Sequence, residues 1–199
     1  MTLPDAARPS SFRPQPARMR RLAGARGVTL IELLVTVAVA ALIITLGVPS
    51  FVSAITRHAI QSQAEELQDA VRIGRNEAMK RSGPVILCRT EPDAPRRCAG
   101  TGGNWQTWLM FADIGRRGTY AADDPLVRER TDVSKRTTVT SDTPSIRFDA
   151  TGIAVAESGT SAFVFAPAGQ ASGNGGLGKR LCVNQRAEVA IVQGDAACP

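Results

Sequence analysis

The sequence predicts an α+β fold in which one long N-terminal helix packs on antiparallel β-sheet. Three observations predict it. The run from Leu33 to Thr56 carries no charged side chain. The next stretch, to about Arg81, repeats apolar residues at spacings of three and four, which is typical of an amphipathic helix. The remainder is rich in Gly, Pro, Ser and Thr, which favours short strands and many turns.

The apolar run is long enough to cross a membrane, because a hydrocarbon core about 30 Å thick needs roughly 20 apolar residues in a helix. From Val28 to Ile55 the only charged side chain is that of Glu32. A charge costs roughly 2.5–3.5 kcal/mol at the bilayer centre and less near an interface. A bare anchor has no use for this carboxylate, so we expect a partner to pair with it.

The second half of the predicted helix is amphipathic, and its apolar face needs a cover that the rest of the chain must supply. The helix is expected to stop near Arg81, since Gly83-Pro84 follows, and to kink at Gly47/Pro49. The lone histidine, His58, is predicted to be a surface residue. The predicted buried face comprises Ile60, Ala64, Leu67, Val71, Gly74 and Ala78.

The segment from Pro84 onward shows no helical periodicity and is predicted to form strands. In the run Trp105–Phe111, alternation assigns Trp105, Thr107, Leu109 and Phe111 to one face, and both faces carry apolar groups. We therefore expect this strand to be covered on both sides. The predicted strands are Val85–Arg89, Trp105–Phe111, Leu126–Arg130, Thr137–Thr140, Ser145–Phe148, Ala162–Ala166, Lys179–Val183 and Glu188–Val192.

The formal net charge of +6 is concentrated at the N-terminus. Residues 1–27 hold six arginines against one aspartate, which leaves 18 basic and 17 acidic side chains in the rest of the chain. A chain that loses this leader has no global basic field to attract nucleic acid. A local basic patch remains compatible with the composition.

The four cysteines, Cys88, Cys98, Cys182 and Cys198, all follow the apolar run. An even count beyond a membrane segment favours disulfides in an oxidising compartment. The alternative is a four-thiolate zinc site, but structural zinc sites usually have two to four residues between paired cysteines. Pairing Cys88 with Cys98 and Cys182 with Cys198 makes the shortest loops, although four cysteines allow three connectivities.

The apolar run is preceded by the basic stretch Arg18–Arg26, which ends in Gly27. The stretch Gly27-Val28-Thr29-Leu30-Ile31-Glu32-Leu33-Leu34 resembles the class III leader site of type IV pilins and type II secretion pseudopilins. The resemblance implies that a prepilin peptidase cuts after Gly27 and N-methylates Val28, where the family usually has Phe. Glu32 matches the family's hallmark carboxylate, and Pro49 falls where pilin helices have a kinking proline.

The resemblance also implies a partner for Glu32. In an apolar helix bundle a carboxylate must be compensated, and the family uses the free N-terminal amine of a neighbouring subunit. The arginines before the helix are expected to stay cytoplasmic by the positive-inside rule. The chain is then a single-pass inner-membrane protein with a periplasmic C-terminal body, which becomes extracellular in a pilus.

The C-terminal body resembles the GspH/FimT minor pseudopilin domain in three blocks and in its Cys-containing end. The resemblance implies a type IV pilin-like fold, no cofactor, no metal, and other major and minor pilin or pseudopilin subunits as partners. The expected parts are a leader (1–27), a transmembrane or filament-core helix (28–56), an amphipathic helix (57–82) and a β domain (83–199). The blocks are Trp105–Asp113, Asp124–Arg130, Ile146–Gly152 and Leu181–Cys198.

The sequence contains no recognisable catalytic pattern. Gly173–Gly178 formally matches G-x-G-x-x-G but opens no helix, so it is interpreted as a loop and not a phosphate cradle. Asp113, Asp123 and Asp124 are candidate calcium ligands, although acids in turns are common. A lone juxtamembrane histidine excludes a Ser-His-Asp set. The chain is predicted not to be an enzyme.

A local basic cluster, Lys179, Arg180 and Arg186, is the candidate for DNA binding. Some FimT-like proteins take up DNA through a C-terminal Gly-Arg-x-Arg motif, and the matching stretch here is Gln185–Glu188. Only the first arginine is kept, and Glu188 would repel phosphate. The predicted function is a minor type IV pilin for pilus assembly, with DNA uptake as an added role. The alternatives are a type II secretion pseudopilin and a DNA receptor at the pilus tip.

Overall fold

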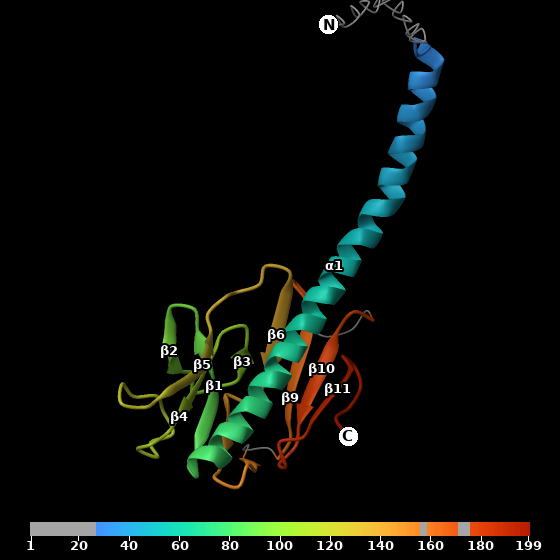
Figure 1. Ribbon diagram of the computed structural model, residues 1–199. Helices are drawn as coiled ribbons and strands as arrows, with labels where there is room; N and C mark the ends of the chain where they lie inside the picture. The colour runs from blue at the N-terminus through green and yellow to red at the C-terminus, as the bar shows by residue number, and fades with distance from the viewer. Residues whose placement is uncertain (1–26, 156–158, 171–175) are drawn as a thin grey trace, which may run out of the picture. The chain divides into compact units, whose positions relative to one another are not determined.

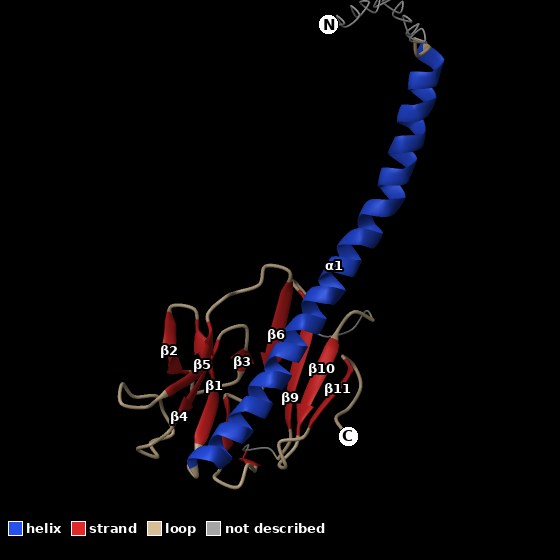
Figure 2. Ribbon diagram, viewed as in Figure 1, coloured by secondary structure: helices blue, strands red, loops and turns tan. Residues whose placement is uncertain are grey.

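The computed structural model describes residues 27–155, 159–170 and 176–199, and the backbone alone at residues 46–49. One helix is followed by eleven strands in the described residues (Figures 1 and 2). The molecule divides into two compact units, the second being Thr45–Pro199. The elements are α1 (Leu30–Arg81), β1 (Val85–Glu91), β2 (Ala94–Cys98), β3 (Gly103–Asn104), β4 (Trp108–Ala112), β5 (Leu126–Arg130), β6 (Thr137–Ser141), β7 (Ser145–Phe148), β8 (Ala154–Val155), β9 (Ser161–Pro167), β10 (Lys179–Val183) and β11 (Val189–Gln193).

Helix α1 ends at Arg81, as the Gly83-Pro84 pair predicts. Its last turn closes with a Schellman motif: the Gly83 amide donates to the Ala78 carbonyl and the Ser82 amide to the Met79 carbonyl, both at 3.2 Å. Ser82 occupies the left-handed position, with φ of 49°. The predicted kink at Gly47/Pro49 falls on residues whose side chains lie outside the described part, and it stays a prediction.

The strands form two antiparallel sheets, and within Thr45–Pro199 the C-terminal half of α1 runs along them (Figure 2). The first sheet has the order β5-β4-β1-β7-β8, with β2 also paired to β1. The second has the order β11-β10-β9-β6-β3. All eight predicted strands are present to within a few residues at their ends, whereas the short strands β2, β3 and β8 were not predicted.

The largest difference concerns the predicted strand Trp105–Phe111, which begins only at Trp108. The three residues before it carry the chain from β3 in the second sheet to β4 in the first. The Trp105 amide donates to the Val139 carbonyl at 2.7 Å, and the Trp105 indole N–H donates to the Thr143 carbonyl at 2.8 Å. Because the crossover breaks the alternation, Trp105 packs in the main core with Trp108, and its predicted face was wrong.

The main core lies between α1 and the inner faces of both sheets. Every residue of the predicted helix face is buried, together with Gln63 and Ala70, which were not predicted. Gln63 accepts a hydrogen bond from the Thr137 hydroxyl at 2.7 Å, so its burial is compensated. Aromatic side chains fill the centre, where Trp105 and Phe163 meet edge to face with centroids 4.8 Å apart.

A smaller apolar cluster covers the other face of the first sheet, so β4 is buried on both sides as predicted. Its buried members are Ile86, Cys88, Leu109 and Phe111. Tyr120, from the segment between β4 and β5, packs against Phe111 with ring centroids 5.3 Å apart. Burial on both faces explains why the strand has no polar side.

The unit Thr45–Pro199 contains its own core. Among the described residues, the buried apolar side chains lie between Ile60 and Ala187, and both disulfides lie within the same range or just after it. The described residues from 27 to 45 are all exposed and contribute nothing to that core. A fragment covering residues 57–199 is therefore expected to fold without the apolar half of α1.

Candidate functional site

The predicted cleavage residues Gly27 and Val28 are exposed and precede α1 directly. The leader, residues 1–26, lies outside the described residues. The Thr29 hydroxyl accepts a hydrogen bond from the Glu32 amide at 3.3 Å, so Thr29 is the N-cap of α1. Thr29 would remain in the chain after cleavage at Gly27, and the cap would remain with it.

Glu32 lies in the first turn of α1. Thr29 and Glu32 stand at the N-cap and N3 positions of a capping box. A carboxylate here also interacts favourably with the positive end of the helix dipole. In the described part of the chain, however, the Glu32 carboxylate has no hydrogen-bond or ion-pair partner. The described residues thus explain the position of Glu32 in part and give its charge no partner.

The side chains around Glu32 in the first turns of α1 are apolar and exposed. Helix α1 contains a stretch that is long and apolar enough to span a membrane, and none of that stretch is buried. Leu30 and Ile31 are 78% and 66% exposed. Large aliphatic surface of this kind is favourably removed from water at about 25 cal/mol per Å². The helix therefore needs a lipid or protein environment that the described residues do not provide.

The predicted basic cluster is not brought together. Lys179 begins β10, whereas Arg186 lies in the turn between β10 and β11. The strand from Lys179 to Val183 spans about 13 Å. Arg186 lies beyond the end of this strand, so it is at least that far from Lys179 along the strand direction. Asn184 shapes the turn, because its side-chain oxygen accepts from the amides of Arg186 and Glu188, both at 3.0 Å.

The side chain of Arg180 binds the C-terminal tail. Its guanidinium donates to the Ala196 carbonyl at 2.8 Å, and its side chain is half-buried. The tail is also held by the Cys182–Cys198 disulfide. Of the three candidate cations, Arg186 is exposed, whereas Lys179 and Arg180 are half-buried.

Both cysteine pairs are disulfides, with the shortest-loop connectivity. Cys88 bonds to Cys98 with Cα atoms 5.5 Å apart, and Cys182 bonds to Cys198 with Cα atoms 5.6 Å apart. No cysteine is free, and all four lie in the described residues. The zinc alternative is therefore excluded.

The three candidate calcium ligands gather around an arginine instead of a cation site. Asp123 and Asp124 contact the Arg117 guanidinium at 2.6 and 3.3 Å. The buried carboxylate of Asp113 accepts from the amides of Arg117 and Gly118 at 2.8 and 3.0 Å. The hydrogen bond from Arg117 lowers the pKa of Asp123, and the same bond raises the pKa of Arg117. These carboxylates hold the segment between β4 and β5 over the smaller apolar cluster.

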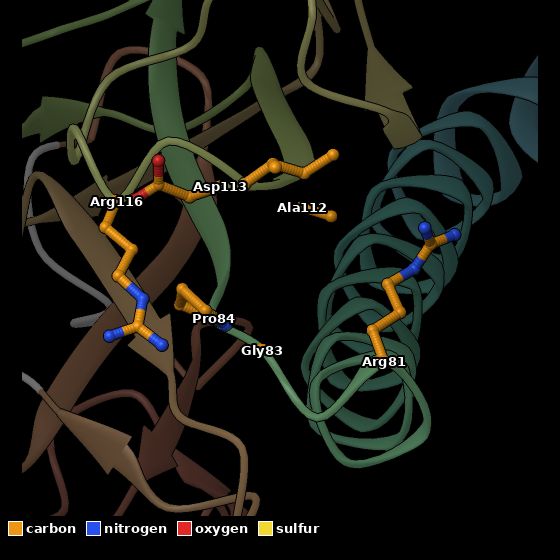
Figure 3. A pocket seen from close by; sticks show the side chains of 7 residues that line it. Arg81, Gly83, Pro84, Ala112, Asp113 and Arg116 are labelled. Carbon is orange, nitrogen blue, oxygen red and sulfur yellow. The ribbon is translucent and has the colours of Figure 1, made fainter.

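A cavity of about 420 Å³ lies where α1 ends. Figure 3 shows Arg81 of α1 and Arg116 of the segment after β4 on opposite sides of it, with Pro84 and Asp113 between them. The cavity contains no pairing of a nucleophile with a base. His58 is exposed, and the described part of the Gly173–Gly178 stretch leads into strand β10, so it does not open a helix.

The described residues thus show no catalytic constellation, and their most unusual feature is the uncovered helix. The family described as Type II transport protein GspH matches residues 63–187. The minor pilin FimU of Pseudomonas aeruginosa PAO1 is similar in structure, with 18% identity, a TM-score of 0.52 and coverage of 68% of this chain and 90% of FimU. The minor pseudopilin EpsH from the Type 2 Secretion System of Vibrio cholerae has 11% identity, a TM-score of 0.45, and coverage of 67% and 95%. No curated protein matches this chain. The predicted fold class is confirmed.

Proposed function

The chain belongs to the GspH family, and on this premise we propose that it is a minor type IV pilin that helps to assemble or initiate a pilus. The observation that carries the proposal is the exposed apolar half of α1, which finds no cover among the described residues. A membrane would cover it before assembly, and the helices of other major and minor subunits would cover it in a filament. The function lies in assembly and not in catalysis.

Maturation is the first step of the proposed mechanism. A prepilin peptidase cuts after Gly27 and methylates the amine of Val28, leaving α1 in the inner membrane and the β domain in the periplasm. Both residues are exposed and precede the first helical turn, which suits access by an enzyme. Intact-mass measurement of the membrane-bound protein tests this step. A mature chain that begins at Val28 with one added methyl group is expected, and retention of the leader would contradict it.

Glu32 is proposed to set the register between subunits by pairing with the N-terminal amine of a neighbour. An unpaired carboxylate in an apolar bundle is costly, and pairing it with an opposite charge removes that cost while specifying one alignment. The competing explanation is helix capping, because Glu32 stands at the N3 position after the N-cap residue Thr29. The two explanations differ for glutamine, since Gln also serves at N3 of a capping box but carries no charge.

The experiment compares Glu32→Ala, Glu32→Gln and Thr29→Ala in a pilus-forming cell. If pairing is the role of Glu32, all three variants should reach the membrane fraction, and both Glu32 variants should be lost from sheared filaments while Thr29→Ala is retained. If capping is the role, Glu32→Gln should enter filaments normally. Normal incorporation of Glu32→Ala would refute both explanations.

The alternative within the family is a minor pseudopilin of a type II secretion system. Neighbouring genes distinguish the two: other minor pilins favour the pilus, and a secretion ATPase with an outer-membrane secretin favours secretion. A deletion strain gives the matching readout, which is loss of surface pili in the first case and retention of secreted enzymes inside the cell in the second.

The remaining alternative is DNA uptake, with the chain as a receptor at the pilus tip. It would rest on Lys179, Arg180 and Arg186, of which Arg186 is exposed and the other two are half-buried. The test is DNA binding by residues 57–199 over a range of salt, because phosphate contacts weaken steeply as salt rises. Binding that Arg186→Gln abolishes would support this role, and no binding at low salt would remove it.

A further inference from the structure

The segment between β5 and β6, residues 131–136, is attached to α1 at both of its ends. Arg130, just before it, forms an ion pair with Glu66 of α1. Thr137, just after it, donates its hydroxyl to Gln63 of α1 at 2.7 Å. Within Thr45–Pro199, Figure 1 shows this segment at the end of the β domain from which α1 emerges. The two attachments place the segment beside the first turns of α1 that the domain covers.

The chemistry of this segment is basic and partly apolar. Lys135 and Arg136 are exposed, and their side chains have no ion-pair or hydrogen-bond partner in the described part of the chain. Val133 is 50% exposed. Arg57, on α1, is exposed at the same end of the domain, and Asp132 is the one acidic side chain within residues 131–136. The net charge of these groups favours an anionic partner.

The segment is long enough to reach the end of the charge-free run of α1. Seven residues separate Gln63 from Thr56, which at 1.5 Å per residue is about 10 Å along the helix. Three extended residues, which is half of the segment, span about 10 Å. The middle of the segment, at Val133, can therefore reach the level at which the apolar run ends and Arg57 follows.

We propose that residues 131–136, with Arg57, bind the anionic phospholipid headgroups of the membrane that holds α1. The inference rests on the proposed function, because it requires α1 to be membrane-anchored. Each Lys or Arg near an anionic surface contributes about a fivefold preference for the docked state. Few cations suffice, since the anchor keeps the segment at a high effective concentration near the lipid.

Lipid is favoured over nucleic acid as the occupant because of where the segment lies. In the anchored subunit this end of the domain is adjacent to the bilayer, where headgroup phosphates are abundant and a duplex has little room. The exposed Val133 also suits the interface between headgroups and acyl chains better than it suits a phosphate backbone. Docking would hold the β domain against the membrane until the subunit enters a filament.

The test uses the full-length chain in lipid nanodiscs of phosphatidylcholine, with or without about 30 mol% phosphatidylglycerol. Because all four native cysteines are in disulfides, Val133→Cys supplies a single thiol for a fluorophore. Its quenching by a headgroup spin label reports contact with the lipid surface. The matched control is Ile114→Cys, because Ile114 is 66% exposed and lines the same cavity as Arg81 at the C-terminal end of α1. Arg81 is about 27 Å farther along the helix than Gln63.

Quenching at position 133 is expected to rise with phosphatidylglycerol and to be absent at position 114. Adding Lys135→Gln and Arg136→Gln should lower the ratio of docked to undocked molecules about 25-fold, and 0.5 M salt should act in the same direction by screening, where the Debye length falls below about 8 Å. Quenching at 133 that is unaffected by phosphatidylglycerol or by the double substitution would overturn the inference. A label at Phe51→Cys, quenched from the acyl chains, reports anchoring separately. If the label at position 51 is not quenched from the acyl chains, α1 is not anchored in the membrane, and the inference fails together with the proposed function.

Discussion

Gly74 is where α1 packs most closely on the β domain, and replacing it tests the packing argument. A Cβ built at Gly74 would lie 2.5 Å from Cε2 and 2.8 Å from Cδ2 of Phe148 on β7. Carbon atoms in contact are normally about 3.5–4.0 Å apart, so the overlap is about 1 Å. Phe148 is fully buried within the main core.

We expect Gly74→Ala to destabilise the domain despite the better helix propensity of alanine. Overpacking costs about 1–3 kcal/mol, and an overlap of about 1 Å with a fully buried ring favours the upper end of that range. The exchange of Gly for Ala within a helix gains about 1 kcal/mol. The net loss is then about 2 kcal/mol. Urea unfolding of residues 57–199 measures it as a lower midpoint at constant slope.

The effect of Gly74→Ala on stability should change from destabilising to stabilising when the Phe148 ring is replaced by a smaller side chain. Phe148→Leu destabilises the domain on its own by leaving a cavity, but it removes the atoms that Gly74→Ala would meet. In that background Gly74→Ala should stabilise by about 1 kcal/mol. Asn76→Ala, at an exposed position of the same helix, is the control and should gain similarly in both backgrounds. A stabilising Gly74→Ala in the wild-type background, or additive effects in the double variant, would refute the close-contact argument.

Three further predictions concern the helix end, a turn and the tail. Ser82→Gly should raise stability by about 1 kcal/mol in urea unfolding, because Ser82 has φ of 49° and glycine adopts that conformation without strain; an unchanged midpoint would contradict this. The Thr151 hydroxyl, which donates to Asp149 at 2.6 Å, is the main cause of the lowered pKa of Asp149. That stabilisation is complete above the unfolded pKa of about 3.9 and is lost as pH falls through the lower folded value. Asp149→Asn should therefore show a smaller loss of melting temperature below pH 4 than the wild type, and parallel curves would count against it. Replacing Cys182 and Cys198 by serine should cost about 3 kcal/mol and release the tail to proteolysis, and unchanged protease resistance would show that the tail is held by other contacts.

The sequence by itself determined the features that depend on neighbouring residues. Periodicity predicts the buried face of α1 and most strand positions. Turn residues predict the end of α1, and short loops favour the pairing of neighbouring cysteines. The uncovered apolar run with Glu32 at its start was evident for the same reason, since length and charge are local properties. The residues that carry the proposed function were thus largely identified from the chain alone.

The tertiary structure decided what depends on pairing between distant segments. Only the two-sheet topology shows that the chain crosses between sheets at Trp105, which moves that side chain into the main core. Only the register of β10 and β11 shows that Arg186 lies in a turn, far from Lys179. The attachment of residues 131–136 to α1 likewise joins residues more than sixty positions apart. Composition and periodicity cannot specify such contacts, because each one depends on which strands become neighbours when the chain folds.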